Sequence, residues 1–156
     1  MADPRPMWTC PLCGRTFANR NQTHTCRGLG SVEDHLSGKP TEIVATYRAL
    51  EAAVRELGPV EVLAEGTRIA FHRRMSFAAC TVRQRWVDAH VVLARRIRDP
   101  RFTTVQTCSP RNHLHVFRLQ TPEDVDGRVR AWLAEAYEVG RQRHLERPRR
   151  RVGPRR

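Results

Sequence analysis

Long apolar runs are missing from this chain, and none approaches the ~20 residues that a membrane-spanning helix requires. The N-terminal segment also lacks the apolar core of a secretory signal peptide. We therefore expect a cytoplasmic protein with no membrane partner. The five cysteines, an odd number, agree with a reducing compartment in which cysteine binds metal rather than forming disulfides.

The familiar catalytic motifs are missing as well: the chain has no glycine-rich phosphate loop, no serine-centred elbow and no HExxH helix. Cys80 and Cys108 are possible nucleophiles, but the FAACTV segment around Cys80 is typical of a buried core. His113 and His115, two apart on an expected strand, point to one face and could form a patch with His90 on an uncovered sheet surface. No catalytic constellation is identified, and the enzyme hypothesis is not the favoured one.

Lysine is nearly absent, since Lys39 is the only lysine among the 28 basic residues. Arginine richness is weak evidence of phosphate binding, because genome composition can produce it. The charge is more informative: the net charge is +12, and residues 141–156 hold eight arginines against Glu146. Such a charge attracts nucleic acid, anionic lipid or acidic proteins.

The segment WTCPLCGRTFANRNQTHTC, residues 8–26, has the pattern of a zinc site. Cys10 and Cys13 form a CxxC turn followed by Gly14, which can adopt the positive φ that such a turn needs. His24 and Cys26 follow after ten residues and complete a Cys3His set suited to a structural Zn2+ ion. Trp8 and Phe17 are expected to form the apolar lid of this module.

Alternatives to this zinc assignment remain open. Only one residue separates His24 from Cys26, a short spacing for zinc ligands, so His35 could replace one of the two. A disulfide or a pair of buried cysteines is a second possibility. A thioredoxin-like redox pair is disfavoured, because the polar run 18–23 is neither strand nor helix.

Composition divides the chain into four parts. Residues 1–7 form a disordered leader and residues 8–38 the zinc-binding module. Residues 41–140 form an α+β domain. Residues 141–156 form a basic disordered tail, because they are almost without apolar side chains and are interrupted by proline.

Three helical segments are expected. Ser31–Asp34 begins a single capped turn that Gly38 ends. Residues 41–57 carry apolar side chains at 4-3-4-3 spacing, with Thr41 as the cap, which predicts a helix covering a core. The last helix is predicted from Thr121 to Gly140, with a proline and two acidic residues in its first turn.

Between the long helices the apolar pattern has a period of two. It predicts four strands, at residues 67–71, 77–82, 86–93 and 113–119. Short turns make consecutive strands antiparallel, and residues 95–107 form a longer connection. The predicted fold class is therefore α+β: a small N-terminal zinc knuckle followed by a two-layer domain of helix, four-stranded antiparallel meander and helix.

Basic residues could form a phosphate-binding surface on this sheet. If Arg68, Arg118 and His90 share the open face, that face suits a nucleic-acid backbone, with Trp86 and His113 as stacking groups. The alternative is a solvated outer face without a ligand. The candidate nucleic-acid-binding residues are Arg68, Arg73, Arg74, Arg85 and Arg118, and in the tail Arg149, Arg150 and Arg151.

Three stretches make the chain resemble a bacterial family, domain of unknown function 5655, in the form with an N-terminal zinc-finger-like segment. They are WTCPLCGRTFANRNQTHTC, GTRIAFHRRMSFAACTVRQRW and AWLAEAYEVG. The resemblance covers nearly everything from Trp8 to Gly140. It implies an α+β domain in the cytoplasm and carries no catalytic residues over to this chain.

Three functional hypotheses follow from these features. The first is a zinc-binding accessory protein that associates with nucleic acid through its basic surface and arginine-rich tail. The second is a small-ligand-binding protein or enzyme that uses the open sheet face and has a structural zinc. The third is an adaptor that binds a protein partner through the zinc module.

Overall fold

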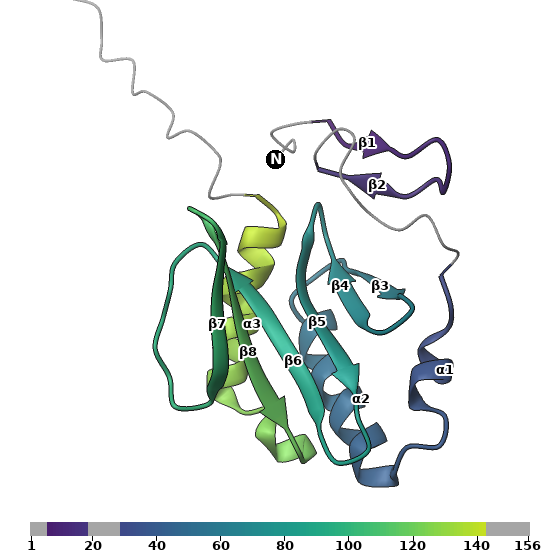
Figure 1. Ribbon diagram of the computed structural model, residues 1–156, viewed down its shortest axis with the longest axis vertical. Coiled ribbons are helices and arrows are strands. Elements are labelled where there is room, and N and C mark those ends of the chain that lie inside the picture. Colours follow the sequence, from purple (N-terminus) through teal and green to yellow (C-terminus); the bar gives the residue numbers. More distant parts are fainter. Residues whose placement is uncertain (1–5, 19–28, 143–156) are drawn as a thin grey trace, which may run out of the picture.

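The computed structural model describes residues 6–18 and 29–142, which form a small hairpin and an α+β domain (Figure 1). The hairpin pairs β1 (Trp8–Thr9) with β2 (Thr16–Phe17). The domain has a six-stranded antiparallel sheet with the order β3-β4-β5-β6-β8-β7. Its strands are β3 (Glu61–Ala64), β4 (Ile69–His72), β5 (Ser76–Val82), β6 (Val87–Leu93), β7 (Phe102–Ser109) and β8 (Asn112–Leu119).

The α+β class is as expected, but the four-stranded meander is wrong. The sheet gains β3, from a run directly after the predicted helix, and β7, most of which lies in the segment expected to be a connection. β6 pairs with β8 rather than with β7, and β7 lies on the outer side of β8. The strand order therefore departs from that of a meander. Both extra strands are edge strands. β7 is largely exposed and rich in polar residues, so it lacks the apolar alternation that marks a half-buried strand.

The helices differ from the predicted segments mainly at their starts. They are α1 (Val32–Leu36), α2 (Thr41–Arg55) and α3 (Gly127–Gly140). α1 has the expected capping box between Ser31 and Asp34. In α2 the cap position is Pro40, so Thr41 is the first helical residue rather than the cap.

The segment after Thr121 does not start the last helix. It forms the separate short 3-10 turn η1 (Pro122–Asp124), and α3 begins only at Gly127. Asp126 caps α3, because its Oδ1 atom accepts a hydrogen bond of 3.0 Å from the Val129 N–H. The prediction was wrong here because Asp126 offers a second good cap five residues after the first.

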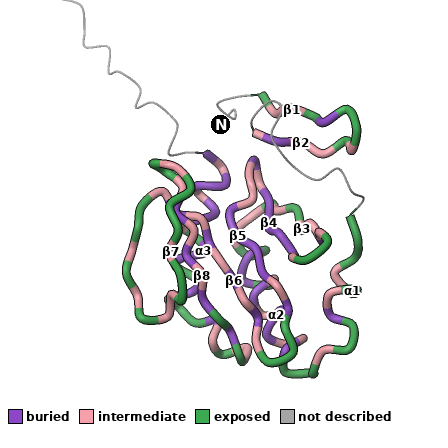
Figure 2. The backbone as a smooth tube through the Cα atoms, in the orientation of Figure 1, coloured by how far each residue is buried: buried purple, intermediate pink, exposed green. Residues whose placement is uncertain are grey.

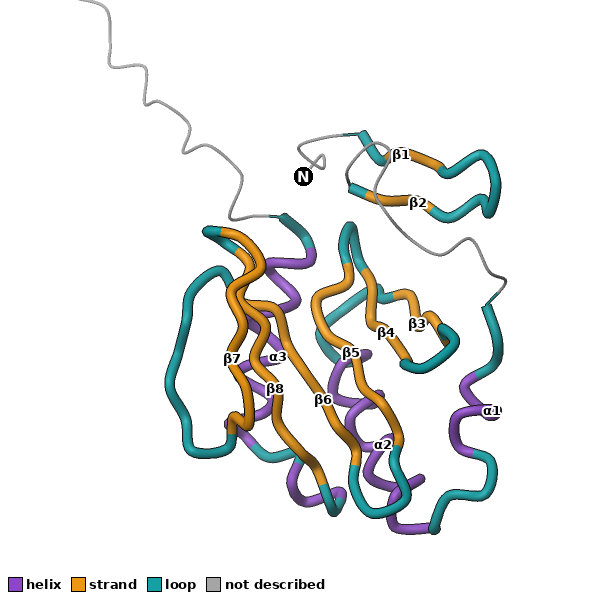
Figure 3. Tube along the Cα trace, in the orientation of Figure 1, coloured by secondary structure: helices purple, strands orange, loops and turns teal. Residues whose placement is uncertain are grey.

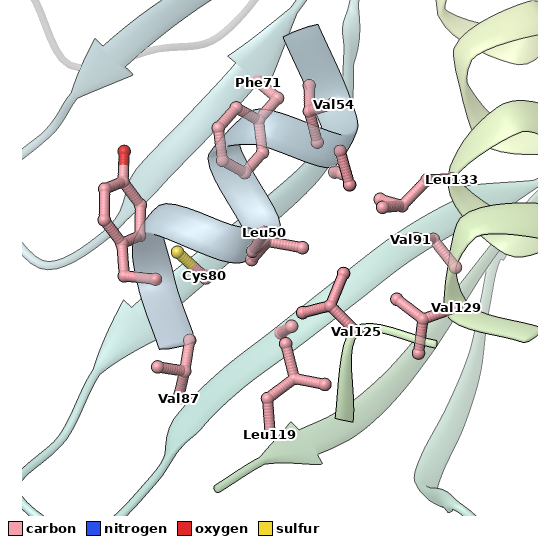
Figure 4. Packing of buried hydrophobic residues seen from close by; sticks show 14 of the residues in the cluster. Leu50, Val54, Phe71, Cys80, Val87, Val91, Leu119, Val125, Val129 and Leu133 are labelled. Atoms are coloured by element: carbon pink, nitrogen blue, oxygen red, sulfur yellow. The ribbon is translucent and has the colours of Figure 1, made fainter. Parts of the chain in front are cut away.

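One face of the sheet is covered by helices. Figure 3 shows α2 and α3 on the same side of the strands, and both helices contact β6. The close view in Figure 4 shows Leu50 and Val54 of α2, and Val129 and Leu133 of α3, packed over Val91 of β6. Tyr47, Phe71, Phe77 and Phe117 are other large side chains that are fully buried.

The opposite face carries no helix from α2 or α3, and we call it the open face. Burial along β6 alternates strictly, with the odd-numbered residues buried and the even-numbered residues half-buried. Figure 2 shows this alternation along β6. Across residues 6–18 and 29–142, no helix is both long and apolar enough to cross a membrane.

α1 belongs to the α+β domain rather than to the hairpin. Leu36 is buried and is part of the same apolar cluster as the residues of α2 and α3, with Val32 packed against it. The core of the domain therefore starts before residue 41, where composition placed the beginning of the α+β domain.

Candidate functional site

Charged residues and a histidine from neighbouring segments of the sheet lie on the open face. Arg118 of β8 lies opposite Asp88 of β6, and His90 of β6 lies opposite Ala79 of β5. Side chains of directly opposed residues point to the same side of a sheet. Arg68, directly before β4, is close enough to His90 to influence its charge. The sheet therefore places Arg68, His90 and Arg118 on one face, with β5 and β6 between Arg68 and Arg118.

Asp88 is bracketed by two guanidinium groups. Its Oδ1 atom accepts from Arg118 Nε at 3.2 Å and its Oδ2 atom from Arg83 Nε at 3.3 Å. The Arg118 guanidinium also stacks over the Trp86 ring, 4.3 Å from the ring centroid. One carboxylate thus orients two arginines without cancelling their charge, beside an aromatic ring that nucleic-acid bases could stack on.

Glu65, in the turn between β3 and β4, is the matching carboxylate at the other end of this surface. It forms a 2.6 Å contact with Arg68 Nε, and Arg15 of the N-terminal hairpin lies 3.9 Å away. The Glu65 carbonyl accepts a hydrogen bond of 2.7 Å from His35 Nε2. The turn therefore fixes Arg68 and also anchors both the hairpin and α1.

Burial controls the charge of His90. Its half-buried position, followed by the neighbouring Arg68 guanidinium, lowers the pKa of His90 from 6.5 to about 4. His90 is therefore neutral at physiological pH. The positive charge of the open face comes from arginine, and His90 supplies a neutral imidazole between the two arginines.

Two of the remaining arginines proposed for nucleic acid, Arg73 and Arg74, lie in the turn between β4 and β5, outside the Arg68–Arg118 group. Arg74 is buried, with 4% of its surface exposed, and its Nε donates to Gln142 Oε1 at 3.1 Å, so its assignment to nucleic acid was wrong. Arg85 is exposed in the turn between β5 and β6, next to Trp86. Arg149, Arg150 and Arg151 lie outside the described residues.

The expectation that His113 and His115 lie on the open face with His90 was wrong. Both are buried and alternate with half-buried Leu114 and Val116, and they share the helix-covered side with Phe117. Their ring nitrogens have protein partners, which explains how two polar rings can be buried there. Ile97 N donates to His115 Nε2 at 3.1 Å, so His115 Nδ1 carries the proton and donates to the His113 carbonyl at 2.9 Å.

The position of these histidines leaves aliphatic side chains on the open face. Val92 lies directly opposite Leu114, and Val116 lies opposite His90. All three aliphatic residues are half-buried. Sequence alone does not reveal this strip, because the two faces of β8 are similar in hydropathy and alternation does not tell which one packs on the helices.

The N-terminal hairpin contains the first half of the predicted zinc motif. Cys10 and Cys13 lie in the turn between β1 and β2, where the Gly14 N–H donates to the Cys10 carbonyl at 2.8 Å. Gly14 has φ of 73°, as a turn of this kind requires. Trp8 and Phe17 pair beside the turn with ring centroids 6.1 Å apart.

The second half of the motif, His24 and Cys26, lies outside the described residues. Within the described ranges, no three His, Cys, Asp or Glu side chains gather closely enough to hold a metal ion. His35, the alternative ligand, instead binds the Glu65 carbonyl.

The two candidate nucleophiles also lie apart from the open-face arginines. Cys80 is buried on the helix-covered side, and burial raises the pKa of its thiol well above the ordinary value, so it remains a neutral core residue. Cys108 is exposed on the edge strand β7.

Comparison with known families identifies the domain. A family model described as Domain of unknown function (DUF5655) matches residues 32–140. The chain belongs to this family. The DUF5655 match begins at α1 and ends with α3, so it includes the whole six-stranded sheet and all three α-helices and leaves the hairpin outside. No curated protein and no solved structure matches the chain.

Proposed function

We propose that this DUF5655 protein is a zinc-binding accessory protein that associates with nucleic acid. The observation that supports the proposal is the grouping of Arg68 and Arg118 on the sheet face that α2 and α3 leave open. A cytoplasmic location is part of the proposal.

The charges around this grouping favour a polyanion. Among the described residues, Arg68, Arg83 and Arg118 form ion pairs with two carboxylates, those of Glu65 and Asp88. Positive charge therefore remains on the surface, in a form pre-oriented for phosphate oxygens. Trp86, under Arg118, offers a ring on which a base of single-stranded nucleic acid can stack.

Zinc would act as a structural ion in the N-terminal module. Cys10 and Cys13 would supply two thiolates from the hairpin turn, and His24 and Cys26 would complete the set. The fit rests on the donor types and on the tight turn at Gly14, which places both cysteines in one turn. The ion would hold together a segment too small to fold by hydrophobic burial alone.

A salt titration of binding to duplex DNA and to single-stranded DNA tests the proposal. Each phosphate contact on a duplex contributes about 0.9 to the slope of log affinity against log salt. Arg118→Gln and Arg68→Gln should each lower affinity for both ligands and reduce the duplex slope by about one. Deletion of Arg147–Arg156, which removes six arginines, should reduce it by about three to five.

The matched control is Arg130→Gln in α3, which removes one charge from an arginine paired with Glu56 on the helix side. This variant should leave the slope unchanged. Equal loss in Arg130→Gln and Arg118→Gln would contradict a site on the open face. Absence of binding by the full chain at low salt would overturn the nucleic-acid proposal.

The aliphatic strip of Val92, Leu114 and Val116 favours a second candidate function. Half-buried aliphatic groups beside a neutral His90 suit a small ligand with an apolar body on the open face. Such a ligand would bind with weak salt dependence, in contrast to nucleic acid. A protein partner at the zinc module is the third candidate.

A further inference from the structure

A pocket of about 360 Å³ opens between β7 and the loop that joins β6 to β7. It lies at the β7 edge, where Figure 1 shows this loop extending away from the sheet. Val105 of β7 lies opposite His115, whose side chain is on the helix-covered side. The pocket is therefore separate from the open face. Its lining residues are Arg96, Ile97, Arg98, Asp99, Phe102 and Val105.

The apolar wall of this pocket is held in place by buried groups. Phe102 packs against His115, with ring centroids 4.9 Å apart, and against Trp132 of α3, with centroids 4.4 Å apart. The backbone N–H of Ile97 is bonded to His115 Nε2. The pocket thus has a wall formed before any ligand binds, which reduces the entropy cost of binding.

The four arginines of the loop fall into two pairs. Arg95 bonds Glu135 at 2.9 Å, and Arg101 bonds Asp126 at 2.9 Å. Arg96 and Arg98, the two that line the pocket, form no ion pair with any described residue. Arg96 donates to the Thr107 hydroxyl at 2.8 Å, and both side chains are exposed.

The one carboxylate in the lining does not cancel these two charges. Asp99 accepts from Arg128 at 2.9 Å through Oδ2 and from the Arg101 N–H at 2.9 Å through Oδ1. Only 11% of its side chain is exposed. The pocket therefore presents two uncompensated guanidinium groups beside an apolar wall.

We propose that this pocket binds a phosphate monoester carried on an apolar body. A phosphate monoester has nearly two negative charges at neutral pH, which matches the two guanidinium groups of Arg96 and Arg98. Ile97, Phe102 and Val105 contact the body. The volume is within the range of small-molecule sites, roughly 300–1,000 Å³.

Calorimetric titration of the full chain with phenyl phosphate, inorganic phosphate and benzyl alcohol in physiological salt tests this proposal. Phenyl phosphate should bind at least about tenfold more tightly than either of the others, because only phenyl phosphate satisfies both the arginines and the apolar wall. Absence of heat with phenyl phosphate would overturn the proposal. Equal affinity for inorganic phosphate would overturn the assigned apolar body.

Arg98→Gln should weaken phenyl phosphate binding by about tenfold or more, since it removes a charge-assisted contact from a side chain with no structural role in the described domain. The matched control is Arg85→Gln, an exposed arginine in the turn between β5 and β6, which should change affinity less than about twofold. Equal weakening in the two variants would show a general charge effect and overturn the site. Unchanged affinity in Arg98→Gln would overturn it as well.

Discussion

The two faces of the central sheet are built from alternate residues of the same strands and have opposite character. Along β6 the helix-covered side carries Val87, Val91 and Leu93, none of them exposed, while the open side carries Asp88 and His90. The covered side buries apolar surface against the helices. The open side supplies ion pairs and half-buried groups, both polar and aliphatic.

Because of this difference, the helix-covered face contributes most to the stability of the domain, whereas the open face is available for binding. Burying an apolar side chain gains about 1.5–3 kcal/mol, whereas an exposed ion pair gains about 0–1 kcal/mol. Substitutions on the open face can therefore alter binding while the domain stays folded. Substitutions one residue away in the sequence should unfold it.

The largest contrast in the free energy of unfolding should be found between substitutions of Phe117 and Arg118, which are neighbours in the sequence and lie on opposite faces of the sheet. Phe117→Ala should lower the free energy of unfolding by about 3–5 kcal/mol, because the ring is fully buried against Phe102 and Trp132. Arg118→Gln should cost about 1 kcal/mol, since it removes an exposed ion pair and the stacking contact with Trp86. Urea denaturation of both variants measures this contrast, and similar losses would show that the open face also holds the fold together.

A smaller effect should appear on acidification, through His90. The folded protein has the lowered pKa, so the unfolded chain takes up the proton first and the free energy of unfolding falls as pH drops from 6.5 toward about 4. The limiting slope for one histidine is about 1.4 kcal/mol per pH unit. His90→Gln should therefore reduce the stability lost between pH 7 and pH 5 by about 1–2 kcal/mol.

Thermal or urea denaturation at the two pH values measures this change. The acid sensitivity should not vanish, because burial also lowers the pKa values of His72 and His115. Identical pH dependence in His90→Gln and the native protein would show that His90 is not the group responsible.

The smallest effect on the domain should come from removing zinc. Cys10→Ser and Cys13→Ser should each abolish zinc binding, because a closed four-ligand site loses one thiolate. The α+β domain should lose less than about 1 kcal/mol, since no hairpin residue belongs to its apolar core and the contacts between the two include the Arg15–Glu65 pair and a hydrogen bond between the Thr16 backbone and His72. Elemental analysis and denaturation measure the two results. Zinc retained in both variants would contradict the ligand assignment, and global unfolding would contradict the independence of the domain.

Several features were predictable because their causes are local. The stripe of α2, the capping box of α1 and the alternation in β6 depend on residues within a few positions of one another. The turn at Cys10 and Cys13 is similarly local, since Gly14 and the CxxC spacing specify it. The candidate surface on the open face was predictable in part, because strand alternation places Asp88 and His90 on the same side.

The amino-acid sequence by itself determined the α+β class, most elements, the hairpin turn and the positive charge. The tertiary structure decided which face the helices cover, the position of β8 between β6 and β7, the burial of Arg74, and the pocket at Arg96 and Arg98. These features depend on contacts between segments far apart in the chain. His115 shows the reason most clearly: its face was ambiguous in the alternation of β8, and it is stabilised by a hydrogen bond from Ile97, 18 residues away, and by the ring of Phe102.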